Sequence, residues 1–302
     1  MMQLETIANN SALSEKGREG QVYFYLIADA AGIPSLAEEL SMFEGSYEIL
    51  FPKDYEEDLA EVSPYIIEVN ADTKSYCERL FATYYNKHSL IFCHSYVGLE
   101  SLAQHFRSYT SYLLPESKEQ VMVAFYDARV LPGFVNALDT EQLSAFMEPI
   151  ISLYAEDERD ASVMNSWAGE AAFFVPQWDS EEIREFSQEN VDKLEQHEEQ
   201  RTYLKMAKSL KELYTDSLDG YDIPTLESMA KVTTKKMKTY KLDKYNQFFQ
   251  LFAWEVFYGK DYEQNKTSVN LMNVLKTDLP SDEKFELYKT TIEKYSLQRN
   301  AS

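Results

Sequence analysis

The sequence predicts two lobes: an N-terminal α+β or α/β lobe with a mixed, partly parallel sheet, and an all-α C-terminal lobe. Three observations predict this arrangement. Short apolar runs alternate with amphipathic segments over residues 21–178. No convincing strand pattern follows Asp179. Residues 201–302 hold 17 Lys and Arg against 14 Asp and Glu (+3), whereas residues 1–200 hold 12 against 37 (−25).

These patterns divide the chain into a polar leader (1–20), an α/β lobe (21–178) and an all-helical lobe (179–302). The 302 residues suffice for two cores, and 44% hydrophobic and 14% aromatic residues are typical of globular proteins. The leader has neither the basic nor the apolar region of a secretory signal. No apolar run reaches the eighteen residues of a membrane span. We therefore expect a cytoplasmic protein without a membrane span.

In the first lobe, aromatic and β-branched runs predict strands, and apolar residues at helical spacing predict helices. The predicted strands are 21–30, 64–69, 89–95, 121–126 and 171–178. The predicted helices are 34–43, 73–85, 99–114 and 139–154. Asp139 and Gln142 have the spacing of a capping box at the start of the last helix. Strands interleaved with helices of this length imply partly parallel pairing.

In the second lobe, residues 179–218 predict a helix longer than those of ordinary globular proteins, so we expect either a break in it or an arm between the lobes. Four further helical segments follow, separated by short polar links: 226–240, 241–259, 267–276 and 282–297.

The sequence contains no recognised catalytic, nucleotide-binding or metal-binding motif. GxSxG, GxGxxG, GxxxxGK[ST] and HExxH are all absent. Cys77 and Cys93 form neither a CxxC pair nor a disulfide framework. His88, His94 and His105 lack metal-ligand spacing. We therefore expect no cofactor and no metal.

Charge excludes a further class of partner, because a net charge of −22 does not suit binding to nucleic acid. The acidic runs 56–61, 155–160 and 195–200 lack the spacing of a calcium loop, and we interpret them as solvated faces.

The stretch VMVAFYDARVLPGFVNAL, residues 121–138, leaves two interpretations open. Asp127 follows an apolar run that predicts a strand, and Arg129 lies two residues later. An acid beside a cation in that position suits an active site. It equally suits a corner, where the carboxylate accepts backbone N–H bonds and the arginine pairs with it.

Two features of the second lobe are candidates for partner binding. Residues 231–244 carry six lysines and one aspartate, and we single out Lys235, Lys236 and Lys238 as an electrostatic dock; an ordinary solvated helix face is the alternative. Aromatic residues crowd the next helix, where Trp254 and Phe257 fall largely off the predicted core stripe.

The ordered motifs of residues 21–155 resemble the N-terminal domain of the Tap/Tec family, the adaptor chaperones of bacterial type VI secretion. The matching segments are YLIADA (25–30), SPYIIEV (63–69), Tyr-Asp-Ala-Arg-Val-Leu (126–131) and Phe-Met-Glu-Pro-Ile (146–150). The residues that carry the resemblance are Asp29, Tyr65, Tyr126, Asp127, Arg129 and Pro149. The family has Pro where this chain has Ala128, and Pro132 follows four residues later. The next helix therefore has either an irregular first turn or a start near Leu131.

The resemblance implies a non-enzymatic protein that binds a toxic effector and helps mount it on the spike protein of the secretion machine. Two alternatives stay open at this stage. One is a hydrolase or transferase that uses Asp127, Arg129 and carboxylates brought in by folding. The other is an immunity or scaffold protein that binds a toxin.

Overall fold

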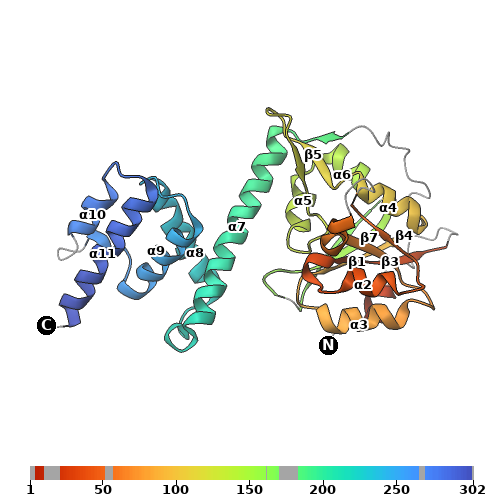
Figure 1. Cartoon of the computed structure of the whole chain (residues 1–302), viewed down its shortest axis with the longest axis horizontal. Helices are drawn as coiled ribbons and strands as arrows, with labels where there is room; N and C mark the ends of the chain where they lie inside the picture. Colours follow the sequence, from red (N-terminus) through yellow and green to blue (C-terminus); the bar gives the residue numbers. More distant parts are fainter. Residues whose placement is uncertain are drawn as a thin grey trace. The chain divides into compact units, whose positions relative to one another are not determined.

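The computed structural model of the chain describes residues 4–9, 21–51, 57–160, 162–169, 183–264 and 269–300. The chain divides into two compact units, Met1–Gln196 (unit 1) and His197–Ser302 (unit 2), as drawn in Figure 1. The strand predicted at 171–178 and the predicted boundary after residue 178 lie outside the described residues.

Six strands of unit 1 form one sheet in the order β2-β3-β1-β4-β7-β8. Every neighbouring pair in this sheet is antiparallel. The strands are β1 Tyr23–Asp29, β2 Tyr47–Ile49, β3 Pro64–Glu68, β4 Leu90–Ser95, β7 Ile150–Glu156 and β8 Met164–Ala168.

The expectation of parallel pairing in this sheet was wrong. The two strands that run in the same direction, β3 and β4, are not neighbours, because β1 lies between them. β3 and β4 both pair antiparallel with β1, so they run in the same direction. Helix α3 (Lys74–Tyr84) connects them, but β1 lies between them. This is a split β-α-β unit, whose sequence pattern is the same as that of adjacent parallel strands.

Both faces of the sheet are covered by helices (Figure 1). Along β1, Tyr25 and Ile27 join the core on one face, and Leu26 and Ala28 join the core on the other, as strand alternation requires. The first face is covered by α4 Leu99–Arg107, α5 Leu131–Ala137 and α6 Thr140–Met147. The second face is covered by α1 Leu4–Ala8, α2 Leu36–Ser41 and α3.

A second, three-stranded sheet has the order β6-β5-β9, with β5 Ser111–Leu113, β6 Gln120–Met122 and β9 Arg184–Glu185. The pair β5·β9 is parallel, and it supplies the parallel pairing of the fold. Three expectations are corrected here: the helix at 99–114 ends at Arg107, the strand at 121–126 ends at Met122, and a strand follows Asp179. Strand pairing decides these elements: β5 pairs with the nearby β6 and also with β9, some seventy residues away. The buried rings of Tyr112 and Phe186 stack beside the β5·β9 pair at 3.9 Å.

The predicted helix at 139–154 is two elements. Its start is confirmed, since Asp139 and Gln142 form the capping box of α6. The helix ends at Met147, and residues 150–154 belong to β7, which is buried along its whole length. Pro149, which cannot continue a hydrogen-bonded helix, separates them. A continuous apolar run fits a strand buried on both faces as well as a helix.

Helix α7 (Gln188–Leu213) begins in unit 1 and continues into unit 2. Asn190 is buried, and its side-chain amide donates to the carbonyl of Ala137 at 2.6 Å while its oxygen accepts from Ser187 N at 2.8 Å. Within the helical segment predicted over 179–218, regular helix spans Gln188–Leu213, and a 3₁₀ turn follows at Thr215–Leu218.

The described residues of unit 2 are helical, as predicted. After α7 come α8 Ile223–Lys238, α9 Tyr245–Tyr258, α10 Val269–Leu275 and α11 Ser281–Asn300. Asp222 caps α8 by accepting Thr225 N at 2.8 Å. Leu251, Phe252 and Tyr288 are among the residues of the core that these helices share.

Candidate functional site

Asp127 lies in a turn between β6 and α5, and not at the end of a buried strand. Its carboxylate accepts Arg129 N and Arg129 Nε on one oxygen, at 2.8 and 2.9 Å, and the other oxygen meets Arg129 Nη2 at 2.6 Å. The Asp127 side chain is 13% exposed and that of Arg129 is 43% exposed. Asp127 thus folds its own turn through a backbone bond and a bidentate ion pair.

The turn resolves how the following helix starts. Helix α5 begins at Leu131 with Pro132 in its first turn, a position where proline is favoured because the first-turn N–H groups have no acceptor within the helix. Ala128 is buried, and its N–H donates to the carbonyl of His88 at 3.4 Å. A proline at this position would lack that donor.

The structure brings Asp29 to this turn although 97 residues separate it from Asp127. Asp29 ends β1, is largely buried, and accepts Ala31 N at 3.1 Å. Burial raises the pKa of Asp29, and the charge of Asp127 adds to this, whereas the Ala31 N–H and the Arg129 guanidinium oppose it. Asp29, Asp127 and Arg129 of the sequence motif therefore form one acidic corner, in which two carboxylates lie near one guanidinium.

The other motif residues are buried and make contacts within unit 1. Tyr126 is buried, with its ring edge-on to Phe51, and burial with the nearby charges of Asp29 and Asp127 raises its pKa to about 12. Tyr65 on β3 donates to the carbonyl of Ala60 at 3.1 Å. Pro149 is buried, and its carbonyl accepts Ser95 Oγ at 2.6 Å. None of these contacts requires a ligand.

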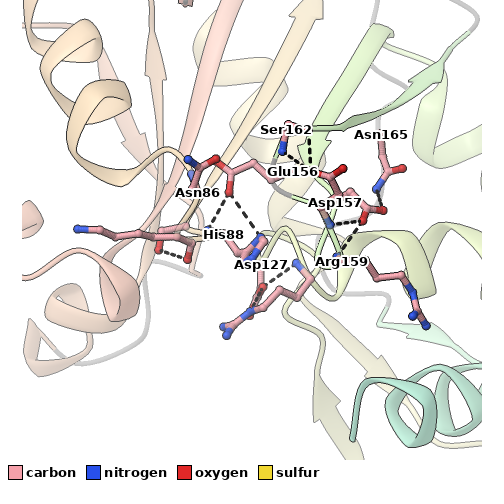
Figure 2. A network of polar contacts seen from close by, with 12 residues as sticks. Asn86, His88, Asp127, Glu156, Asp157, Arg159, Ser162 and Asn165 are labelled. Atoms are coloured by element: carbon pink, nitrogen blue, oxygen red, sulfur yellow. Dashed lines mark hydrogen bonds and ion pairs between the residues drawn. The ribbon is translucent and has the colours of Figure 1, made fainter. Parts of the chain in front are cut away.

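A second polar cluster, which the sequence did not reveal, lies beside the turn (Figure 2). The fully buried Glu156, at the end of β7, accepts Asn86 N at 2.7 Å and His88 N at 3.0 Å. His88 Nδ1 lies 3.5 Å from the same carboxylate. Burial raises the pKa of Glu156, and the two N–H bonds partly offset this effect.

The chain before β4 is shaped to present these donors. Asn86 and His88 have φ values of 72° and 59°, the left-handed conformation that asparagine and histidine adopt more readily than most residues. Backbone N–H groups from such turns form a concave site for an anion, which here is the carboxylate of Glu156. The interpretation of residues 155–160 as a solvated run was therefore wrong for Glu156.

The residue after Glu156 organises the loop between β7 and β8, also drawn in Figure 2. Burial alone would raise the pKa of Asp157, but N–H bonds from Asp160 and Arg159 and the amide of Asn165 lower it. These bonds are 3.0, 2.8 and 3.2 Å long. Asp157 thus stabilises the β7–β8 loop by accepting these three hydrogen bonds.

In unit 2, the lysines of the predicted dock differ in availability. Lys236 is 20% exposed and pairs with Asp261 at 2.7 Å and with the fully buried Glu263. Lys238 pairs with Glu199 at 2.7 Å and is half exposed, and Lys235 is exposed. Lys236 therefore holds unit 2 together, and only Lys235 and Lys238 present their charges to solvent.

The two singled-out aromatics also differ. Trp254 stacks on Phe285 and Tyr288 at ring distances of 6.3 and 5.8 Å, so it packs on the core. Phe257 is 44% exposed and meets only the edge of the half-exposed Tyr214 among the ring contacts described for it.

The described residues contain no group of three or more His, Cys, Asp and Glu side chains arranged to hold a metal ion. Burial lowers the pKa of His94 and of His105 to about 4 and raises the pKa of both cysteine thiols. In the described part of the chain, no helix has the length and apolar character needed to cross a bilayer.

Comparison with known proteins gives a family match for part of unit 1. Residues 24–145 match the family described as Domain of unknown function (DUF4123). No curated protein and no solved structure gives a significant match. The matched residues run from β1 through α6 and include Asp29, Tyr65 and the Asp127 turn. Unit 1 of this chain thus contains a DUF4123 domain, the domain found in the Tap/Tec adaptors of type VI secretion effectors.

Proposed function

We propose that this protein is a cytoplasmic adaptor chaperone that binds one secreted toxic effector and helps mount it on the spike protein of a type VI secretion machine. The observation that carries the proposal is the DUF4123 domain at residues 24–145, which is found in adaptors of this kind. The order of the motif residues in the sequence agrees with that family membership.

The contacts of Asp127 and Glu156 support a structural role for these carboxylates rather than a catalytic one. Both oxygens of Asp127 are occupied by Arg129, and both oxygens of Glu156 are occupied by backbone N–H groups. A general base needs a lone pair directed at a substrate proton. These carboxylates instead direct their lone pairs at donors of the same chain, so we assign them a structural role.

The experiment is co-expression of the full chain with the toxin encoded beside it and with a spike protein, followed by affinity purification. We expect the chain to retain the toxin, and the spike protein to be retained more strongly when the toxin is present. Recovery of neither protein would contradict the proposal.

We further propose that the exposed residues Lys235, Lys238 and Phe257 of unit 2 contribute to partner binding. A charge-reversed Lys235→Glu variant or a truncated Phe257→Ala variant should retain less partner, because both side chains reach solvent. Lys231→Glu is the matched control for the charge change, since Lys231 is exposed on the same helix. If Lys235→Glu and Phe257→Ala retain as much partner as Lys231→Glu and the unsubstituted chain, Lys235 and Phe257 do not belong to the interface.

A further inference from the structure

The short helix α1 occupies one face of the six-stranded sheet. Leu4 and Ile7 are each 5% exposed and join the core that β1, β3, β4 and α3 share. The carbonyl of Ala8 lies 3.3 Å from Nε2 of the buried His94 on β4. Glu5 pairs with Lys74 of α3 at 2.7 Å. Helix α1 is therefore held by two aliphatic side chains, one carbonyl and one carboxylate.

This attachment is small enough to be reversible. A helix of five residues is far below the roughly 12–15 residues that can hold helical structure in water, so α1 is helical only while it is docked. The Glu5 and Lys74 side chains are 58% and 51% exposed, and exposed pairs of this kind contribute little. Removing Leu4 and Ile7 takes no strand out of the sheet, because α1 lies on its face.

The surface beneath α1 stays apolar when α1 leaves. The Phe24 and His94 rings stack at 4.6 Å, and Tyr154 meets His94 edge-on at 5.9 Å. His94 Nε2–H faces the carbonyl of Ala8, and Nδ1 then accepts the Ser152 hydroxyl at 3.1 Å. Undocking of α1 would thus expose a groove with an apolar floor and one N–H donor, a surface suited to a protein partner.

The chain between α1 and β1 is long enough to let α1 leave without strain. Ala8 and Phe24 both contact His94, so the fifteen residues between them begin and end at one place.

We propose that this groove docks an amphipathic helical segment of the partner protein, and that α1 is its tethered internal competitor. The contacts of α1 specify the occupant: two aliphatic side chains three residues apart, a carboxylate next to the first, and a free carbonyl after the second. Lys74 lies where it pairs with the carboxylate and would repel a cation, and His94 binds the carbonyl. That the partner is the effector rests on the proposed function, whereas the groove and its competitor do not.

Competition between α1 and the partner segment sets how far α1 lowers the apparent affinity of the groove for that segment. A tether of this length gives an effective concentration on the order of 1 mM. If a free segment with two aliphatic anchors binds with a Kd of about 0.1–0.5 mM, the docked α1 weakens its apparent affinity about threefold to tenfold.

The first test measures binding of a fluorescent peptide of residues 1–12 to the full chain by polarisation. Ile7→Asp places a charge where Ile7 is buried and should release α1, whereas Thr6→Asp places the same charge on the exposed side of the helix. We expect Ile7→Asp to bind the peptide about threefold to tenfold more tightly than either the unsubstituted chain or Thr6→Asp. Equal affinities for the three chains, or no binding to Ile7→Asp, would overturn the proposal.

Two controls keep this test decisive. Leu4→Asp releases α1 from its other anchor and should give the same gain as Ile7→Asp, so that a folding defect in one variant does not decide the result. A peptide carrying Glu5→Lys should bind the Ile7→Asp chain more weakly than the unsubstituted peptide, because it meets Lys74 with like charge. A peptide that binds as well with Glu5→Lys would show that the groove does not select a carboxylate, contrary to the proposal.

The second test asks whether the effector uses the groove. We expect the Ile7→Asp chain to retain more co-expressed effector than Thr6→Asp, and excess unlabelled peptide to reduce that retention. Peptide binding without any effect on effector retention would overturn the assignment of the partner. Failure of every chain to capture an effector would instead contradict the proposed function, and the peptide result would still report on the groove.

Discussion

Replacing Asp127 by alanine separates a structural corner from an active-site acid. Asp127→Ala removes the acceptor for Arg129 N and all three hydrogen bonds to the Arg129 guanidinium. It also removes a negative charge near Asp29. If the corner is structural, the variant loses stability in unit 1, and any loss of partner binding follows from that.

The magnitude follows from the exposure of the two side chains. The bond to Arg129 N resembles a helix N-cap, whose loss costs about 0.5–2 kcal/mol. The ion pair adds at most about 1 kcal/mol, since the Arg129 side chain is 43% exposed and water screens it. We expect the free energy of unfolding of unit 1 to fall by about 1–2 kcal/mol, and its Tm by about 2–8 °C.

The assay is thermal and urea unfolding of the full chain, with hydrogen exchange of unit 1 peptides to identify which unit unfolds. Asp127→Asn is the matched control, because its amide oxygen still accepts Arg129 N and only the charge is lost. It should cost less than half as much as alanine. Unchanged unfolding of Asp127→Ala together with lost function, or a turnover lost in Asp127→Asn with partner binding intact, would refute the structural assignment.

Three further predictions concern buried polar groups. Lys236→Met leaves the fully buried Glu263 without its cation and should lower the unfolding free energy of unit 2 by about 3–5 kcal/mol in urea titrations. The exposed Lys235→Met should change it by less than about 0.5 kcal/mol, and equal effects would contradict this role. Burial raises the pKa of Glu156, so its contribution is fully present below its ordinary value of 4.5 and is lost as pH rises through the higher folded value. Relative to Glu156→Gln, the unsubstituted chain should therefore lose stability as the pH rises above 4.5, whereas parallel curves would exclude a raised pKa. Asn190→Ala removes the bond to a buried carbonyl at the end of α5 and should cost about 1–3 kcal/mol. Hydrogen exchange should then speed up first at the start of α7, and unchanged protection there would count against the anchor.

Local patterns in the sequence determined most helices and the central strands. β1, β3 and β4 lie where aromatic and β-branched runs predict them, and Asp139 with Gln142 marks the start of α6 as a capping box requires. The helical character of the described part of unit 2 follows from apolar spacing alone. The resemblance to the adaptor family also rests on sequence order, because Asp29, Tyr65 and Asp127 belong to segments that keep their motifs.

Only the tertiary structure decided how these elements pair and what the acids do. The direction of the strands in the large sheet depends on β1 lying between β3 and β4, and no local pattern encodes which strands become neighbours. The apolar run at 150–154 suits either period, and burial on both faces of the sheet selects the strand. The sequence predicts a solvated side chain for Glu156. In the structure Glu156 is buried and accepts N–H groups from Asn86 and His88, two residues in the left-handed conformation. The sequence determines which side chains carry charge. Which groups each charged side chain contacts depends on how segments far apart in the chain pack together.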